Sequence, residues 1–600
     1  MDPALRQYVK DNLDMDLLDI RLAENKAQSF DLMIDTAHFL GHLPEFAEDL
    51  HKKPGKVMNL LKKAAEEELY GAQLSLDMRL ANVPGLKTSK ISDLGVEQRD
   101  ALVRISGTVV RCGGAKSLAT NKAFLCIACK ETFRVEADLQ LYGEITLPAS
   151  CPGKQEGKVK TRRCRGSVFE ESTELTLWKD YREVKVQESF GSVAPGRVPQ
   201  SIWVLLAGNL ANCCSPGDEV TVTGPLLLRW GSLQRDKPCD VQLCLQAFTV
   251  ENDEDKVQRT SQEVEVCPGF GLEMLHCFAS PLLGLDHIKL GLLLCAVGGV
   301  KEDVKGMKLR GHCHALIVGE PGTGKSSLLQ SAAQLKARSV FTNALGTSKA
   351  GLTLSAVKEG GEWMLEAGAL VLSDCGICCI DDFSLFPKED RADIFEAMEH
   401  QTMSVAKAGM VCQVKTRTTV IAACRPVGGR IDSFKDLEEN TGLSTPLLSR
   451  FDLVFILNDS REAELDEIRA DFILNRMWTD SNPAALRSLV DQVKDLEVAL
   501  SESVLSLIRT YYEYARLRLE QLTVRHLESL LRLVQAHAKL CGRLEACELD
   551  ALSVLILMES TARGCGLVTC TSPDICFQSE ELFADACEEV KARLGSLDSN

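Results

Sequence analysis

The sequence predicts a multidomain protein in which a helical segment and a β-rich domain precede a parallel α/β domain. Three observations predict this fold class. A phosphate-loop motif at 319–326 stands between an apolar strand and a helix, strands and helices alternate from about 268 to 460, and short alternating strands begin near residue 101. The chain has 600 residues, whereas single cores usually stop growing at roughly 250–300 residues, so we expect several domains.

The first segment, residues 1–96, is expected to be mainly helical. Pro54 opens a stretch in which apolar residues recur at helical spacing up to Leu69, and proline is tolerated in the first turn of a helix. The N-terminus lacks the basic and then apolar layout of a secretory signal. No apolar run approaches the roughly 18 residues of a membrane span, so we expect no membrane partner.

The second segment, residues 97–250, is expected to form a small barrel or sandwich. An oligonucleotide-binding (OB) barrel fits, although strand pattern alone does not select it. Residues 251–267 follow as a polar, charged stretch and are interpreted as a linker. Strand-like alternation in the segment occurs at 102–111, 181–188, 201–206 and 218–224.

Four cysteines within this β-rich segment have a spacing that suggests a metal site. Cys126 and Cys129 form a C-x2-C pair, and Cys151 and Cys164 follow in polar stretches. Four thiolates complete a tetrahedral zinc site with no open position, which makes such a site structural. The second pair is spaced more widely than C-x2-C, so four free thiols remain the alternative.

Charge and cysteine content narrow the function classes. The net charge of −17 argues against a protein whose whole surface coats nucleic acid. Local charge sets phosphate contacts, so a basic channel remains compatible with this total. The 24 cysteines, without a secretory signal, favour a reducing compartment.

The phosphate-loop motif predicts ATP binding. Its glycines let backbone N–H groups turn inward around phosphate oxygens at the N-terminus of a helix. Lys325 is expected to reach the β- and γ-phosphates, and the Ser326 hydroxyl to ligate Mg²⁺. The expected nucleotide-binding residues are Gly319, Glu320, Pro321, Gly322, Thr323, Gly324, Lys325, Ser326 and Ser327.

A second motif, 378–383, completes the expected hydrolytic site. It is an apolar strand that ends in Asp381 and Asp382. A nucleotide-hydrolysing site places its magnesium-orienting aspartate and its water-activating acid at such a strand end. We therefore expect Asp381 to hold Mg²⁺ together with Ser326, and Asp382 to act on the attacking water.

From Pro268 to about Lys539 the chain resembles the minichromosome maintenance (MCM) helicases, which are AAA+ motor proteins. The N-terminal half also looks like the family's helical, zinc-binding and OB elements, with the zinc module inserted in the barrel. The segments that carry the resemblance are 283–294, 351–358, 366–372, 396–409 and 446–452.

The resemblance implies a six-membered ring that encircles single- and double-stranded DNA, with each ATP site shared by two subunits. It also implies an AAA+ core followed by a helical lid. The implied domains are 1–96 (helical), 97–250 (OB barrel, with a zinc insert at about 124–168), 251–267 (linker), 268–460 (AAA+ core), 461–563 (lid) and 564–600 (tail).

Several residues take roles from this resemblance. Arg450, in Ser-Arg-Phe, matches the arginine finger that enters a neighbour's site, and Arg525 matches the second-sensor arginine, also supplied in trans. Lys407 matches the hairpin lysine that touches the DNA backbone. The basic residues that flank a probable barrel hairpin could line the same channel, and they are Arg229, Arg235 and Lys237.

Within the family, segments 224–230 and 411–419 look most like the ninth member. That branch pairs with the eighth member in a ring that acts in recombination repair in the nucleus. A replicative MCM subunit is the alternative with the same enzyme class. A generic metabolic ATPase would need neither the cysteine cluster nor the hairpin lysine, so it has little weight.

The chain departs from its family at the hydrolytic site. Asp382 stands where the family has Glu, and its carboxylate is one methylene shorter. Arg425 stands where the family has the first-sensor Asn, and it could grip the γ-phosphate or pair with Asp381 and Asp382. We hypothesise that this subunit binds ATP but hydrolyses it slowly, as a structural partner. The competing hypothesis is normal hydrolysis through small backbone shifts. Gln200 also replaces a residue that is basic in the branch, which puts one barrel contact in doubt.

Overall fold

A computed structural model gives the fold of the chain in two compact units, Met1–Thr260 with Ala356–Glu366, and Ser261–Ser355 with Ala367–Asn600. Each unit is described by itself. The structure describes residues 3–12, 29–68, 75–141, 143–152, 154–155, 162–164, 166–189, 197–231, 241–252, 275, 277–304, 307–359, 362–407, 410–432, 434–459, 463–476, 483–519, 522–567 and 580–597.

The first part of unit 1 is a small helical layer with one short sheet. Helix α5 packs against α1, α4 and β2, and β1 pairs with β2 in parallel. Phe39, Leu50 and Leu61 are buried at the centre of this layer. The elements are α1 (Pro3–Asn12), β1 (Ser29–Asp35), α3 (Thr36–His42), α4 (Ala47–Lys52), α5 (Pro54–Glu68) and β2 (Ser75–Ala81).

The rest of unit 1 is built on a closed barrel of five strands. Its neighbours run β4–β11–β12–β10–β9, and an additional pairing of β9 with β4 closes the ring. Ile105, Val204 and Val222 point into its core. The strands are β3 (Thr88–Ser89), β4 (Leu102–Cys112), β5 (Lys116–Cys126), β6 (Thr132–Glu136), β7 (Lys154–Gln155), β8 (Arg162–Arg163), β9 (Phe169–Gln187), β10 (Ser201–Ala207), β11 (Glu219–Trp230), β12 (Val241–Gln246) and β13 (Thr249–Asn252).

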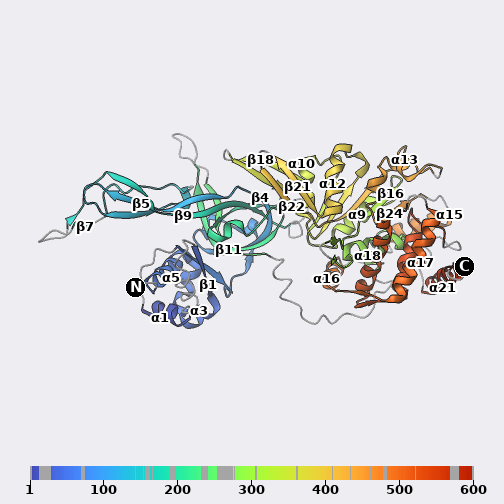
Figure 1. The fold of residues 1–600 in the computed structure, drawn as a ribbon, viewed down its shortest axis with the longest axis horizontal. Helices are drawn as coiled ribbons and strands as arrows, with labels where there is room; N and C mark the ends of the chain where they lie inside the picture. Colours follow the sequence, from blue (N-terminus) through green and yellow to red (C-terminus); the bar gives the residue numbers. More distant parts are fainter. Residues whose placement is uncertain are drawn as a thin grey trace. The chain divides into compact units, whose positions relative to one another are not determined.

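Strand β9 is long enough to serve two structures. Its C-terminal half belongs to the barrel, and its N-terminal half pairs with β5, which pairs in turn with β6. Figure 1 shows β5 and β9 running side by side, away from β11 and towards β7. The cysteine-bearing module is thus a three-stranded extension of the barrel.

Unit 2 contains a five-stranded sheet in the order β17–β20–β23–β16–β24, and every pairing in it is parallel. Alternate residues of its strands face two separate cores. Ile317, Cys379 and Ile421 face the core that contains the C-terminal helices, whereas Leu316 and Cys378 face the other. Burial on both faces explains the near-continuous apolar strands in the sequence.

Helices cover both faces of this sheet. Helices α8 and α9 lie on the face shared with α16–α19, and α12 lies on the opposite face. The elements before the C-terminal helices are α8 (Asp286–Val297), β14 (Glu302–Val304), β15 (Met307–Leu309), β16 (Ala315–Gly319), α9 (Lys325–Ala333), β17 (Ser339–Asn343), α10 (Lys349–Leu352), α11 (Ala369–Leu372), β20 (Ile377–Asp381), α12 (Lys388–His400), β21 (Thr402–Lys407), β22 (Met410–Lys415), β23 (Thr419–Cys424), α13 (Leu437–Thr441), α14 (Thr445–Leu448) and β24 (Leu453–Leu457).

The C-terminal part of unit 2 is helical and packs on α8 through a shared apolar core. Helix α18 contacts α8, α17 and α19. Figure 1 shows α16, α17 and α18 together in the orange and red part of the chain. The elements are α15 (Ala463–Leu474), α16 (Pro483–Val493), β25 (Ala499–Leu500), α17 (Glu502–Arg518), α18 (Val524–Leu540), β26 (Glu545–Ala546), α19 (Glu548–Glu559) and α21 (Glu580–Leu597).

A hairpin from the middle of the chain groups with unit 1. It consists of β18 (Leu354–Glu359) and β19 (Glu362–Ala367), and β19 pairs with β4 of the barrel. Arg111 on β4 donates to Glu359 and Glu366 of the hairpin. The alternation of strands and helices in the sequence did not predict this hairpin. Among the described residues, no helix combines the length and apolar character needed to cross a membrane.

Candidate nucleotide site

The phosphate loop lies between β16 and α9, as the sequence predicts. Gly322 and Gly324 have φ values of +89° and +84°, a region that glycine enters without steric cost. A side chain at Gly319 would meet the Cβ of Leu457 at 2.7 Å and its carbonyl oxygen at 2.8 Å. The loop conformation therefore requires glycine at these positions, and it turns backbone N–H groups towards an anion at the start of α9.

The Lys325 ammonium lies inside this loop. Its Nζ donates to the carbonyl oxygen of Gly319 at 2.7 Å, to that of Glu320, and to Thr323 Oγ1 at 3.4 Å. Burial lowers the pKa of Lys325, and the nearby Arg425 cation lowers it further. Lys325 is thus fixed inside the phosphate loop.

Ser326 and Asp381, which the sequence predicts as magnesium ligands, lie within hydrogen-bond distance of each other. Ser326 Oγ donates to Asp381 Oδ2 at 2.6 Å, and the Asp382 backbone N–H donates to Asp381 Oδ1 at 2.9 Å. A hydroxyl and a carboxylate are oxygen ligands of the kind that Mg²⁺ takes beside nucleotide phosphates. Strand β16 leads into the loop before Ser326, and β20 ends at Asp381. These two strands flank β23, so their carboxyl ends meet at one edge of the sheet.

Arg425 forms a two-contact ion pair with Asp382. Its Nε lies 2.8 Å from Asp382 Oδ1, and its Nη2 donates to Oδ2 at 3.1 Å. Asp382 directly follows β20 and Arg425 directly follows β23, which are neighbouring parallel strands. Of the two alternatives that the sequence leaves open for Arg425, the structure shows pairing with Asp382. Both oxygens of the expected water-orienting acid are therefore engaged by a cation.

Arg450 and Arg525 converge on one carboxylate, Glu399 at the end of α12. Arg450 donates from Nε to Glu399 Oε2 at 3.0 Å and from Nη2 to the same oxygen, and Arg525 donates from Nη2 to Oε1. Burial alone would raise the pKa of Glu399, but Arg450 and then Arg525 outweigh it and hold the pKa below its usual value. The structure thus gathers the two arginines of the expected trans half into one charged group.

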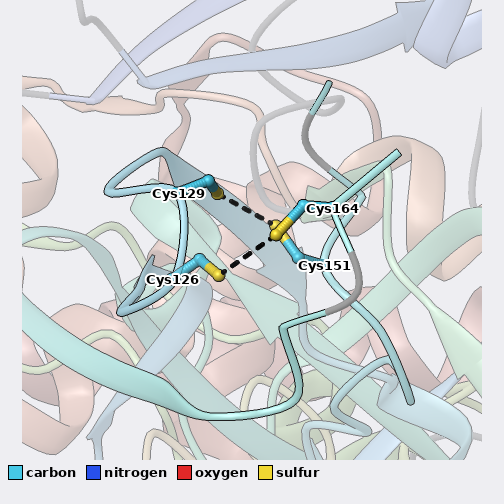
Figure 2. Close-up of side chains that lie close together, drawn as sticks. All are labelled: Cys126, Cys129, Cys151 and Cys164. Atoms are coloured by element: carbon cyan, nitrogen blue, oxygen red, sulfur yellow. Dashed lines mark hydrogen bonds between the residues drawn. The ribbon is translucent and has the colours of Figure 1, made fainter. Parts of the chain in front are cut away.

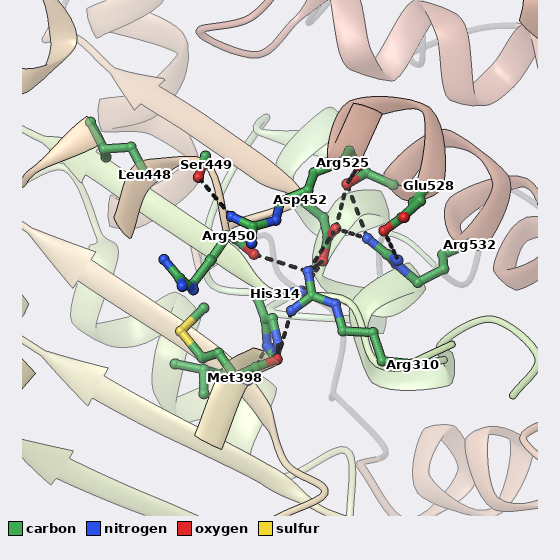
Figure 3. A network of polar contacts seen from close by, with 12 residues as sticks. Arg310, His314, Met398, Leu448, Ser449, Arg450, Asp452, Arg525, Glu528 and Arg532 are labelled. Carbon is green, nitrogen blue, oxygen red and sulfur yellow. Dashed lines mark hydrogen bonds and ion pairs between the residues drawn. The ribbon is translucent and has the colours of Figure 1, made fainter. Parts of the chain in front are cut away.

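A buried carboxylate, Asp452, anchors the segments that carry these arginines (Figure 3). Asp452 accepts hydrogen bonds from Arg532 at 2.6 Å, from Ser529 at 2.5 Å and from the His314 backbone N–H at 2.8 Å. Burial alone would raise its pKa, but Arg532 and Arg310 lower it far below the usual range. Asp452 follows Arg450 by two residues, and Ser529 lies one turn after Arg525 on α18, so both arginines are tied to the same buried charge.

The four predicted metal-binding cysteines come together in the module formed by β5, β6 and β9 (Figure 2). All four sulfurs lie within 4.8 Å of one another, with Cys126 and Cys164 at 3.9 Å and Cys129 and Cys151 at 3.6 Å. Zn–S bonds of about 2.3 Å in a tetrahedron separate sulfurs by about 3.8 Å, so the arrangement can hold zinc. Gly166 permits it, because a Cβ there would lie 2.8 Å from Cys126 Sγ.

Removing two of these cysteines is expected to remove the metal and unfold the module. The purified chain should hold about one zinc ion, and Cys126→Ser with Cys164→Ser should hold about none, because two ligands cannot fix a structural site. Elemental analysis by mass spectrometry measures the zinc content, and limited proteolysis reports whether the module of β5, β6 and β9 stays folded. Cys375→Ser, an exposed cysteine in unit 2, is the control. Zinc content unchanged in the double variant would contradict the assignment.

The structure places the residues that were expected to contact DNA in different environments. Lys407 ends β21 and Met410 begins β22, which places Lys407 beside the tip of an antiparallel hairpin. Arg235 and Lys237 lie outside the described residues. Arg229 is 3% exposed, with its Nη2 near Glu183 and donating to Tyr181 Oη at 3.1 Å. Arg229 shares the face of β11 with Leu227, opposite the face that carries Val222 into the barrel core. Its guanidinium is buried there, so the predicted DNA contact through Arg229 is wrong.

Sequence reasoning missed the carboxylates that organise the arginines. Glu399 and Asp452 are single acidic residues without motif spacing, and their partners lie 51 to 142 residues away along the chain. A further group, His537, Cys541 and Asp550, also has ligand atoms close together. Its carboxylate already accepts from His537, from Arg543 and from the Cys547 backbone N–H, which caps α19. Those contacts account for the group without a metal.

Comparisons with known proteins identify two family domains and several relatives of this chain. The MCM P-loop domain matches residues 256–477, and the MCM OB domain matches residues 90–229. A "Probable DNA helicase MCM9" of Oryza sativa subsp. indica is 36% identical, covering 89% of this chain and 86% of that protein. One of Arabidopsis thaliana is 33% identical, covering 93% of each. "DNA helicase MCM8" of Homo sapiens is 30% identical, covering 87% of this chain and 73% of that protein.

Proposed function

The chain belongs to the MCM family of DNA helicases, and from that premise we propose that it is the ninth-member subunit of a hetero-hexameric ring that unwinds DNA during repair by homologous recombination in the nucleus. The single observation that carries the proposal is the division of the catalytic groups. Lys325, Ser326 and Asp381 form one group, whereas Arg450 and Arg525 form another on Glu399.

This division suits a site that is shared between subunits. The first group binds phosphates and Mg²⁺ but needs cations to stabilise the charge that develops on the transferred phosphoryl group. The second group offers two such cations. A neighbouring subunit that brings its own Arg450-type residue would complete the first group, and this chain would complete the neighbour's site in return.

Relatives support the choice of branch and of partner. Proteins named as probable MCM9 helicases match over most of their length and of this chain, and MCM8 helicases match as well. We therefore propose the eighth-member MCM subunit as the partner. Zn²⁺ in the cysteine module, and ATP with Mg²⁺ in the phosphate loop, are the proposed cofactors. Lys407 is proposed to contact the DNA backbone.

The test is ATP hydrolysis and unwinding of forked DNA by the purified chain, alone and mixed with the eighth-member MCM protein. The mixture is expected to hydrolyse ATP and to unwind DNA faster than either protein alone, and Lys325→Ala should abolish the share of turnover at this chain's own site. A mixture no more active than its separate components would contradict the proposal. Unwinding with replicative MCM subunits in place of the eighth member would favour the replicative reading.

A second candidate function is favoured by the ion pair between Arg425 and Asp382. In this reading the chain binds ATP, hydrolyses it slowly in its own site and serves mainly to complete the partner's site. The Asp382 carboxylate is shorter than the usual Glu and both of its oxygens face the Arg425 guanidinium. An acid held in this way is poorly placed to orient water, since misplacement by about 1 Å can cost on the order of a hundredfold in rate.

Restoring the usual residues is expected to raise turnover at this chain's own site. Asp382→Glu combined with Arg425→Asn should increase it about a hundredfold, because the longer carboxylate would reach the water and its competing cation would be gone. Steady-state hydrolysis with a partner whose own P-loop lysine is replaced measures this site alone. Arg430→Asn, the same charge change in the exposed part of the same loop, is the control. An unchanged rate in the restored variant would favour normal hydrolysis in the natural chain.

A further inference from the structure

We propose that Glu399 is a positioning residue that holds Arg450 and Arg525 as a pair for the phosphates of the neighbouring subunit's nucleotide. This inference rests on the proposed function, because it requires an ATP site shared between subunits. It adds a third residue, an anion, to the group that this chain would present to its neighbour.

The contacts divide the carboxylate between the two arginines. Oε2 accepts from Arg450 Nε at 3.0 Å and from Arg450 Nη2, and Oε1 accepts from Arg525 Nη2. Two guanidinium cations that contact the same carboxylate lie close to each other, and they would repel each other if the anion between them were absent. Glu399 removes that repulsion and fixes the side chains towards one point, which is the geometry that two cations need in order to act on one phosphate.

Each arginine makes one further hydrogen bond that orients it, and each keeps N–H groups for a ligand. Arg450 Nη1 donates to the Pro446 carbonyl at 2.7 Å, and its guanidinium lies 5.3 Å from the centre of the Phe395 ring. Arg525 Nη1 donates to Ser449 Oγ at 3.3 Å. A guanidinium carries five N–H donors, and these contacts with those to Glu399 use three in Arg450 and two in Arg525. The remaining donors can meet phosphate oxygens.

Glu399 is itself held in place through the backbone. The Arg310 guanidinium donates from Nη1 to the Met398 carbonyl at 2.7 Å and from Nη2 to the Arg450 carbonyl at 3.1 Å (Figure 3). Arg310 therefore ties the residue before Glu399 to the residue that Glu399 binds. A positioning residue held by its neighbours in this way lets the two arginines bind a phosphate with little rearrangement.

The chemistry of the carboxylate separates this role from a steric one. Glutamine has the shape of glutamate but only one acceptor oxygen, so it can satisfy one arginine and presents an N–H group to the other. Aspartate is shorter but keeps the charge and both oxygens. A positioning role thus predicts that Glu399→Asp retains more activity than Glu399→Gln, and a steric role predicts the reverse order.

The experiment measures ATP turnover in the mixture with the eighth-member MCM protein and DNA, using a chain that carries Lys325→Ala so that turnover reports the partner's site. We expect Glu399→Gln to lower kcat ten- to a hundredfold, with a smaller change in the KM for ATP, and Glu399→Asp to lose less. In an Arg525→Ala background, Glu399→Gln should cost less than twofold, because one oxygen then suffices for Arg450. The control is Glu528→Gln, the same charge change one turn after Arg525 on α18.

The results separate this inference from the function on which it rests. Equal losses from Glu399→Gln in the parent and Arg525→Ala backgrounds, or activity of Glu399→Gln at or above that of Glu399→Asp, would overturn the positioning role. No turnover in the mixture with unsubstituted Glu399 would overturn the shared site itself. If Glu399→Gln fails to assemble, the comparison of Glu399→Asp in the two backgrounds decides, with a smaller loss in the Arg525→Ala background expected.

Discussion

Replacing Arg450 by alanine is expected to lower ATP turnover at the partner's site by about 1,000- to 100,000-fold. An arginine supplied in trans stabilises charge on the transferred phosphoryl group, and its loss has effects of this order in related phosphoryl-transfer sites. The structure prepares Arg450 for this role, because its guanidinium is oriented by Glu399, by the Pro446 carbonyl and by the face of Phe395. Turnover of the mixture with the eighth-member protein measures the effect.

The controls for this prediction lie within the chain. Arg509→Ala removes an arginine whose ion pair with Glu513 is exposed on α17, and turnover should not change. Lys325→Ala silences this chain's own site, so any turnover that survives it and then disappears with Arg450→Ala belongs to the partner. Loss of this chain's own turnover, with the partner's site unaffected, would show that Arg450 acts in cis.

Replacing Asp452 by alanine is expected to destabilise unit 2 by about 3–5 kcal/mol. Removing one partner of a buried ionic group leaves the remaining charges without compensation in a low-dielectric interior. Asp452 has a side-chain exposure of 1% and holds Arg532 at 2.6 Å and Arg310 at 3.4 Å. Arg532 would remain buried, and Arg310 largely buried, without their anion. Chemical denaturation, with tyrosine and tryptophan fluorescence as the signal, measures the change in the free energy of unfolding.

The pH dependence of this effect has a definite sign. The folded-state pKa of Asp452 is depressed, so its carboxylate contributes stability above its unfolded-state pKa of about 4 and loses it as the pH falls towards the folded-state value. The difference between the natural chain and Asp452→Asn should therefore be constant near neutral pH and shrink below about pH 4. Asp432→Asn, which changes an exposed surface carboxylate, should show a far smaller difference at neutral pH. A neutral-pH difference as small as that of Asp432→Asn would contradict the assigned role.

The nucleotide half of the site could be predicted from sequence because it is local. Lys325 and Ser326 belong to one loop, and Asp381 ends a strand that its own apolar pattern defines. The parallel sheet then brings these strand ends to one edge, so spacing and fold class together suffice. The cysteine module was within reach for a similar reason, since four ligands of one chemistry in a short segment have few other uses.

The arginine half shows where sequence reasoning ends. The resemblance predicts roles for Arg450 and Arg525, whereas Glu399 is one acid among several on α12. Only the packing of α12 against α18 and the loop before β24 reveals its partners. Arg229 misled for the opposite reason. A basic residue near a predicted hairpin suggests a surface contact. The burial of Arg229 against Glu183 depends instead on the arrangement of β9 and β11, two strands that are not paired with each other, and single-strand patterns do not report that arrangement.

The ion pair between Arg425 and Asp382 affects the order in which the subunits of the proposed ring hydrolyse ATP. If this chain alternates with its partner and its own site turns over slowly, two kinds of interface would alternate around the ring. Fast hydrolysis would then occur at every second interface. The slow interfaces would keep their ATP bound and hold neighbouring subunits together while the other interfaces change conformation. The ring would then advance along DNA by one step per pair of subunits, and this chain would keep ATP bound at its own site during that step.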